Sequence, residues 1–363
     1  MKDKINSLES LRGFAALIIA LYHYPSTSFL FAKYGHLAVH FFFTLSGFVI
    51  ALNYFDKINN FKNLIKFQTK RFFRLYPIHI FVLFVVLGIQ ILKLITINFF
   101  NLSSGSDAFA PEDWYTLKDF FHHLFLTQAI FNDSYSMSWN GSAWTISTEF
   151  YTYLIFGLIA LCTRNNKLIF TFVSIFFIYF YDTISSISPF IDELFKLCIK
   201  AFLFGCLFFF IYEKIKFRLN DIFFITLFIL SILIFILVNK ATFSFDELNF
   251  IYNSDTILFC TIILFVSILK KNSFINIFLN FSPFVYFGTI SYSFYMIHKS
   301  VLYLYVQILK YIFNVEFTDI DGTSINLGNP FYDTLITISY IFIAVIVASF
   351  MYTYIETKFR RKN

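Results

Sequence analysis

Arg12 and His23 lie in one apolar segment, residues 11–30, which is long enough to cross a bilayer as a helix. They are eleven positions apart, almost three full turns at 3.6 residues per turn, so both side chains lie on one helical face. Glu9 precedes Arg12 by three positions and can pair with it along that helix. An ionisable group inside the hydrocarbon costs roughly 2.5–3.5 kcal/mol or more, so it is usually retained for a function. A carboxylate, a guanidinium and an imidazole in line therefore indicate a reaction site.

His23 is the candidate general base of such a site. An unperturbed imidazole has a pKa of about 6.5, and its neutral form can take a proton from a hydroxyl group. The alternative is a histidine that only forms hydrogen bonds between two helices. Arg12 and Glu9 on the same face favour the catalytic interpretation, in which they organise the surroundings of His23 or bind the phosphate of a donor.

Two further basic residues, Arg71 and Arg74, are three positions apart and share one helical face just before Tyr76 and Pro77. Guanidinium groups match phosphate oxygens because each can donate two parallel hydrogen bonds. The pair therefore predicts a phosphate-binding site at the cytoplasmic rim, followed by the Tyr-Pro sequence. Ordinary positive charge at the membrane surface, or binding of anionic lipid, is the alternative.

Polar residues recur inside the other apolar segments. Ser46 and Gly47 are small enough to let helices approach closely, and packing is their simplest role. Glu149 is the only acidic residue well inside a clearly bounded span, and it can pair with a base from another helix, orient a substrate hydroxyl, or serve packing alone. His298 and Lys299 close a polar, aromatic stretch in a later segment, where the lysine can extend to the membrane interface.

The composition defines the class of protein. Of 363 residues, 58% are hydrophobic and 14% are charged, against about 25% charged in a soluble domain, and the mean hydropathy is +0.70. Such a chain is an integral membrane protein with several spans, and its net charge of +6 does not indicate nucleic-acid binding. The four cysteines lack the close spacing of a disulfide framework or a zinc site, and no cleavable signal is evident.

Ten apolar segments approach the length of about 20 residues that a helical span needs. They comprise residues 11–30, 37–55, 77–97, 144–162, 167–183, 194–212, 222–238, 256–269, 284–313 and 331–356. Most of the 28 basic residues fall at the chain ends and in the even-numbered loops, whereas the opposite loops are acidic. By the positive-inside rule, both termini are cytoplasmic. The prediction is an all-α membrane bundle of about ten transmembrane helices, a single domain over residues 1–363 with no appended soluble domain.

Five motifs resemble those of the membrane-bound acyltransferase 3 family and occur in the family's order. They are the Arg-x10-His opening (9–16 and His23), the Phe-rich Ser-Gly-Phe segment (38–48), the basic motif before the third span (71–77), the Trp-Ser-Leu-x-x-Glu-x-x-Tyr region (144–151) and the late Ser-Tyr-x-x-Tyr-x-x-His segment (291–298). His40 stands where the family frequently has Asp, and Thr145 replaces the usual Ser. The resemblance extends over essentially the whole chain.

The resemblance implies an integral-membrane O-acyltransferase of the bacterial cytoplasmic membrane. Such an enzyme transfers an acyl group, usually acetyl, from cytoplasmic acetyl-CoA or another acyl-CoA to a hydroxyl of a surface glycan or its lipid-linked precursor. The implied partners are the acyl-CoA donor, a carbohydrate acceptor such as O-antigen, lipopolysaccharide or capsule, and the lipid bilayer. Neither a metal nor a nucleic acid is expected.

The same resemblance assigns roles to individual residues. The catalytic candidates are His23, Arg12, Glu9 and Glu149, and the donor-binding candidates are Arg71, Arg74, Tyr76 and Ser46. His23 is then the general base for direct transfer or, in a less favoured variant, the nucleophile that forms an acyl-histidine intermediate.

Two other classes of membrane protein explain some of these features. A glycolipid transporter or flippase also buries charges, but transporters often have paired repeats and Gly- or Pro-broken helices, and neither is found here. A membrane glycan polymerase or ligase is expected to have a large outer loop with catalytic Arg or His. The largest outer loop of this chain, residues 98–143, is acidic and contains no arginine.

Overall fold

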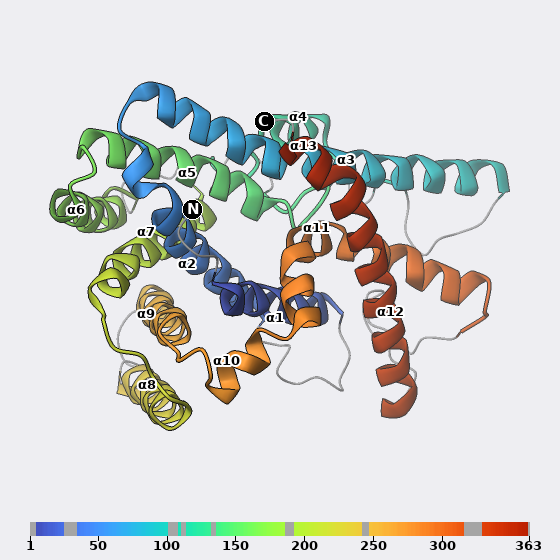
Figure 1. The fold of residues 1–363 in the computed structure, drawn as a ribbon. Helices are drawn as coiled ribbons and strands as arrows, with labels where there is room; N and C mark the ends of the chain where they lie inside the picture. Colours follow the sequence, from blue (N-terminus) through green and yellow to red (C-terminus); the bar gives the residue numbers. More distant parts are fainter. Residues whose placement is uncertain are drawn as a thin grey trace.

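The structure is a computed structural model and describes residues 5–24, 35–100, 108–109, 114–131, 136–185, 192–241, 247–315 and 329–361. Within these residues the chain is all-helical and forms no strand, which confirms the predicted fold class (Figure 1). The helices are α1 (Asn6–His23), α2 (Gly35–Tyr54), α3 (Phe61–Phe100), α4 (Leu117–Phe125), α5 (Trp144–Cys162), α6 (Lys167–Ser185), α7 (Glu193–Lys214), α8 (Asp221–Ala241), α9 (Glu247–Ser267), α10 (Phe274–Leu279), α11 (Ser282–Tyr311), α12 (Pro330–Met351) and α13 (Thr357–Arg361).

Five helical segments are long and apolar enough to cross a membrane, judged by length and composition within the described residues. They are Gly35–Lys57, Phe61–Phe99, Trp144–Cys162, Glu193–Lys214 and Phe331–Arg360, and each contains one of the predicted spans. The other five predicted spans also fall on helices, namely α1, α6, α8, α9 and α11. The total of ten spans and the cytoplasmic termini stay predictions.

Some of the residues from which the number and orientation of the spans are predicted lie outside the described residues. Residues 25–30 of the first predicted span belong to this group. So do most of the acidic loop residues that point to the outer side: Asp107, Glu112, Asp113, Asp133, Asp246, Glu316, Asp319 and Asp321.

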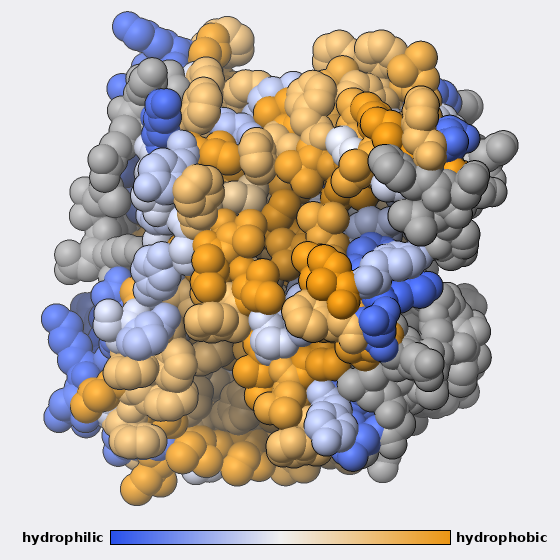
Figure 2. All heavy atoms as spheres, turned by 90° about the vertical axis from the view of Figure 1, so that its right-hand side faces the viewer, coloured by the Kyte–Doolittle hydropathy of each residue, from blue (hydrophilic) through white to orange (hydrophobic). Residues whose placement is uncertain are grey.

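The exterior of the bundle is strongly hydrophobic, as expected for a protein in lipid. Figure 2 shows apolar residues covering the middle of one face, with hydrophilic residues toward its edges. Large apolar side chains are exposed along α12, among them Phe342, Ile346 and Phe350, and along α3, where Phe84 and Leu92 are examples. A water-facing surface would not retain so many exposed apolar side chains.

Helix α3 begins earlier than the sequence predicts. The predicted span starts at Pro77, but the helix starts at Phe61 and carries Pro77 in its interior. A proline removes only one hydrogen bond from the helix, and Tyr292 donates a hydrogen bond to the Leu75 carbonyl in the turn before it, at 2.5 Å. Arg71 lies on this helix, as its spacing from Arg74 predicts, and is 7% exposed.

Glycines allow the closest helix contacts, as the sequence predicts for Gly47. The position of a Cβ atom at Gly47 would be occupied by the Phe202 backbone of α7, so α2 and α7 touch through their main chains. Gly288 of α11 lies in the same way against the Glu9 backbone of α1. Ser10 reinforces this end of α1 by donating a hydrogen bond to the Leu279 carbonyl at 2.5 Å. These contacts set the position of the helix turn that carries Glu9.

Replacing Gly288 with alanine is expected to destabilise the protein by about 1–3 kcal/mol, because the new methyl group overlaps the Glu9 backbone. Thermal unfolding of the purified protein in detergent measures this effect. Gly88→Ala in α3 is the matched control, because nothing lies within 4 Å of the added Cβ atom. There the better helix propensity of alanine leaves stability unchanged or raises it by up to about 1 kcal/mol. Equal melting of the two variants would contradict the tight α1–α11 contact.

Candidate active site

A partly open cavity lies between α1, α2, α3, α5 and α11. Four of the residues that the sequence singles out line this cavity: Arg12, Ser46, Arg74 and Glu149. They come from four different helices, so the packing of the bundle brings them together. Aliphatic and aromatic side chains form most of the remaining wall. An apolar cavity with a few convergent polar groups is the usual form of a small-molecule site.

The carboxylate of Glu149 accepts hydrogen bonds from two hydroxyl groups. Ser46 of α2 donates to Glu149 Oε1 at 2.5 Å, and Tyr153, one turn along α5, donates to the same oxygen. The two hydroxyl oxygens are themselves 3.0 Å apart. Among the described residues these hydroxyls, and not a basic side chain, are the hydrogen-bond partners of Glu149. Ser46 therefore both lines the cavity and donates a hydrogen bond to the Glu149 carboxylate.

The predicted pair of Glu9 and Arg12 is present. Arg12 Nη1 lies 3.2 Å from Glu9 Oε2, and both side chains are largely buried. Because Arg12 also lines the cavity, Glu9 holds a guanidinium group at the cavity wall. A buried charge that is paired in this way costs less than an isolated one.

The predicted donor-binding residues are divided between three places. Arg74 and Ser46 line the cavity. Arg71 donates to the Tyr54 hydroxyl at 2.9 Å, and its guanidinium carbon lies 4.9 Å from the centre of the Tyr54 ring. Tyr76 points elsewhere, because its hydroxyl donates to the Leu124 carbonyl at 3.1 Å. Spacing along one helix correctly grouped the two arginines on α3, but it could not indicate that their side chains end beside different neighbours.

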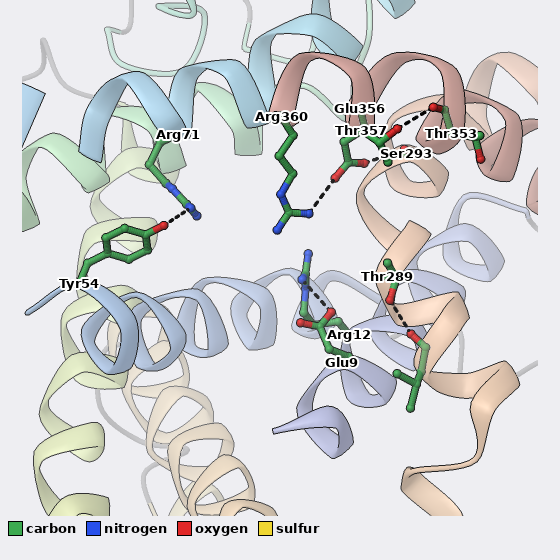
Figure 3. Close-up of polar contacts among 11 residues, drawn as sticks. Glu9, Arg12, Tyr54, Arg71, Thr289, Ser293, Thr353, Glu356, Thr357 and Arg360 are labelled. Carbon is green, nitrogen blue, oxygen red and sulfur yellow. Dashed lines mark hydrogen bonds and ion pairs between the residues drawn. The ribbon is translucent and has the colours of Figure 1, made fainter. Parts of the chain in front are cut away.

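Glu356 and Arg360 are residues that sequence reasoning missed. Glu356 is 2% exposed, accepts a hydrogen bond from Ser293 of α11 at 2.9 Å, and lies 4.0 Å from Arg360 Nη1. Figure 3 shows Arg360 and Arg12 pointing toward one another from α13 and α1, with Arg71 facing the same region from α3. Guanidinium groups from three helices thus face one region of the bundle.

A sequence signal for this pair existed. Glu356 and Arg360 are four positions apart, the spacing of a helical ion pair, at the end of the last apolar segment. Glu356 is the last residue of the predicted span 331–356, and it adds a buried carboxylate to the partly buried Glu149. Helix α12 continues through the π-helical residues Tyr352–Glu356 into α13, so this carboxylate lies inside a continuous helix and not at its end.

His23 lies at the opposite end of α1 from Arg12, about 16 Å further along at 1.5 Å per residue. Its Nδ1 is 2.9 Å from the Ile19 carbonyl and 3.2 Å from Nε2 of His298 on α11. His298 is fully buried, and its Nδ1 is 2.6 Å from the Tyr295 carbonyl. The His23 ring itself is partly exposed. The two histidines are 275 positions apart, and the sequence does not predict their contact.

The cavity and the histidine pair are neighbours but not one space. His23 does not line the cavity, whereas Tyr295, one helical turn before His298, does. Thr145 donates to the Tyr295 hydroxyl at 3.2 Å, and the ring centre of Tyr295 lies 5.8 Å from that of His298. The sequence predicts Arg12 and His23 in one site. In the structure Arg12 lines the cavity, whereas His23 lies beside His298, just beyond the cavity wall.

The family follows from comparison with known proteins. The family model of the acyltransferase 3 domain, described as an acyltransferase domain, matches residues 5–353, so the chain belongs to this family. Acyltransferase MdmB of Streptomyces mycarofaciens is 30% identical over 169 residues, which are 43% of this chain and 39% of that relative. The chain thus aligns with about two fifths of the length of this curated relative. No solved structure matches.

Family membership and the apolar helices together place the chain in a family of membrane-bound proteins that carry an acyltransferase domain. This agrees with the resemblance stated from the five motifs, and it favours a transferase over a transporter or a glycan polymerase.

Proposed function

We propose that the protein is an O-acyltransferase that moves an acyl group, most simply acetyl, from cytoplasmic acyl-CoA to a hydroxyl of a cell-surface polysaccharide or its lipid-linked precursor. It would do so in the bacterial cytoplasmic membrane, with ten spans and both termini inside. The observation that carries the proposal is the cavity, which has arginines at one end and an imidazole pair one helical turn beyond its wall. This order matches a donor with phosphates at one end and a reactive thioester at the other.

The arginines are suited to hold the phosphates of the donor. Arg12 and Arg74 line the cavity, and Arg360 points toward Arg12 from α13 (Figure 3). Hydrogen bonds between guanidinium and phosphate groups are charge-assisted and strong. Glu9 and Glu356, which pair with Arg12 and Arg360, would keep the guanidinium groups oriented when no donor is bound.

The chemical step uses His23 as the base. Its Nε2 takes the proton of the acceptor hydroxyl as the hydroxyl oxygen attacks the thioester carbonyl. A C–O bond forms, the C–S bond breaks, and the proton passes from His23 to the leaving thiolate of CoA. An acyl-histidine intermediate, in which Nε2 itself attacks the thioester, is the second route.

The activity is tested with the purified protein in liposomes, supplied with labelled acetyl-CoA and polysaccharide or lipid-linked glycan from the same bacterium. Label transferred to the glycan is the expected result. Mass spectrometry of surface polysaccharide from a deletion strain tests the same point in the cell, where the mass of one acetyl substituent is expected to disappear. Movement of glycolipid across the membrane without any acyl-CoA would instead favour a transporter.

Arg74→Ala is expected to raise the KM for acetyl-CoA about 10- to 100-fold, because a hydrogen bond to a charged group contributes about 1.5–3 kcal/mol. The kcat should change much less, since the donor's reactive end lies elsewhere. Initial rates over a range of acetyl-CoA concentrations measure both constants. Lys70→Ala is the control, because Lys70 lies on the same helix but lines a separate hollow beside Tyr54 and Lys57. An unchanged KM in Arg74→Ala would remove this arginine from the donor site.

A further inference from the structure

The hydrogen bonds around His23 and His298 determine which ring nitrogens carry hydrogen. A carbonyl oxygen can only accept, so the contact between His23 Nδ1 and the Ile19 carbonyl at 2.9 Å requires a hydrogen on Nδ1. The contact between His298 Nδ1 and the Tyr295 carbonyl at 2.6 Å requires the same of His298. Both rings therefore have their hydrogen on Nδ1 when they are neutral.

The contact between the two rings agrees with this assignment. His298 Nε2 lies 3.2 Å from His23 Nδ1, so the nitrogen of His298 accepts, and the single N–H of His23 is shared between this nitrogen and the Ile19 carbonyl. A charge on His298 is disfavoured because the ring is fully buried, and Lys299 is its immediate neighbour in the chain. With Nδ1 of His23 occupied, its only remaining lone pair is on Nε2. Among the described residues, no hydrogen-bond partner reaches this Nε2 atom.

Other contacts keep the ring of His298 in place. Tyr340 of α12 donates to the His298 carbonyl at 3.2 Å, and the Phe294 ring stacks on the imidazole with the ring centres 6.3 Å apart. Other titratable groups at this end include Tyr22 of α1, whose ring centre is 5.2 Å from that of His23, and His36 of α2, 6.4 Å from Tyr22. Neither of them is bonded to Nδ1 of His23 in the described structure.

We propose that His298 is a positioning residue that, together with the Ile19 carbonyl, holds His23 in the Nδ1–H tautomer and so leaves Nε2 as the basic atom. This inference rests on the proposed function, in which Nε2 takes the hydroxyl proton. When His23 is protonated during transfer, its Nδ1–H donates to His298 Nε2 and the positive charge is stabilised without a carboxylate. A histidine partner of this kind fixes the tautomer and the orientation of the base, as an acidic partner does in other acyl-transferring enzymes.

The activity test compares His298→Leu with His298→Gln. Leucine removes the acceptor, and kcat is expected to fall about 10- to 100-fold, less than the loss of the base itself, while the KM for acetyl-CoA stays within about twofold. Glutamine can place its amide oxygen near the position of Nε2, so it should recover most of the lost rate. Equal rates for wild type and His298→Leu, or no recovery with glutamine in a protein that melts normally, would overturn the inference.

The tautomer can also be measured without any turnover. Nitrogen-15 solid-state NMR of the wild-type protein with labelled histidines distinguishes protonated from unprotonated ring nitrogens, and the His23→Ala spectrum assigns the His23 signals among the seven histidines. We expect one dominant Nδ1–H form of His23 in the wild type. A dominant Nε2–H form would overturn the inference even if His298→Leu failed to fold. A wild type without acyl transfer, or a fully active His23→Ala, would instead refute the proposed function and leave this spectrum interpretable.

Discussion

Replacing His23 with alanine is expected to lower the rate of acyl transfer about 10²- to 10⁴-fold, the usual contribution of a general base. The proton of the acceptor hydroxyl would then have no acceptor at the end of α1. Folding and membrane insertion should persist, because the His23 ring is partly exposed and lies in the last turn of its helix. Initial rates in proteoliposomes with saturating acetyl-CoA measure the effect, and gel filtration with thermal unfolding confirms that the variant is folded.

His36→Ala is the matched control for this experiment. His36 is an exposed imidazole near the same end of the bundle, and its ring contacts Tyr22 and not the histidine pair. This variant should retain wild-type rates. If His23→Ala keeps full activity while His36→Ala behaves as expected, the base must be another group, and the direct-transfer mechanism is wrong.

Glu149→Ala is expected to lower acyl transfer at least about 100-fold. The change removes the acceptor of two hydrogen bonds, each worth about 1.5–3 kcal/mol because the acceptor is charged, and leaves the Ser46 and Tyr153 hydroxyls with only each other as partners. The cavity would then lose the arrangement that orients substrate. Glu149→Gln separates geometry from charge, because the amide oxygen still accepts from both hydroxyls whereas the negative charge is gone. Initial rates and KM values of both variants are the measurements.

Two tyrosines of α5 provide a control for this prediction. Tyr153→Phe removes one of the two donors to Glu149 and should reduce the rate by several-fold. Tyr151→Phe removes a hydroxyl on the same helix that bonds the Phe125 carbonyl away from the cavity, and it should leave the rate unchanged. Similar rates for the two Phe variants would show that the hydroxyl bond to Glu149 has no part in the reaction.

Local spacing predicted the contacts that form within one helix. The ion pair of Glu9 and Arg12 follows from a separation of three residues, because helical geometry alone brings such side chains together. The apolar segments likewise predicted helices at the correct places, since about 20 apolar residues must satisfy their backbone groups internally in lipid. Pro77 marks the start of the predicted apolar span but not of the helix, which begins at Phe61 and includes the two arginines, because the cost of one proline is small beside the packing of the whole helix.

Contacts between helices could not be predicted in this way. Ser46 meets Glu149 across 103 positions, and His23 meets His298 across 275. Whether two such residues meet depends on the rotation and depth of each helix, and these are set by close contacts such as Gly288 against the Glu9 backbone. Arg71 and Arg74 are only three positions apart on α3. Packing nevertheless places Arg71 beside the Tyr54 hydroxyl and Arg74 in the cavity wall.

The sequence by itself determined that this is an all-helical membrane protein of the acyltransferase 3 family, since apolar length and motif order need no knowledge of packing. It also identified residues from four helices that line one cavity. Only the tertiary structure decided that Glu356 and Arg360 join Arg12 near one end, and that the histidine at the other end has an imidazole partner. The physical reason is that a hydrogen bond or ion pair between distant residues requires positions accurate to a few tenths of an ångström, and the packed backbones of the bundle supply that accuracy.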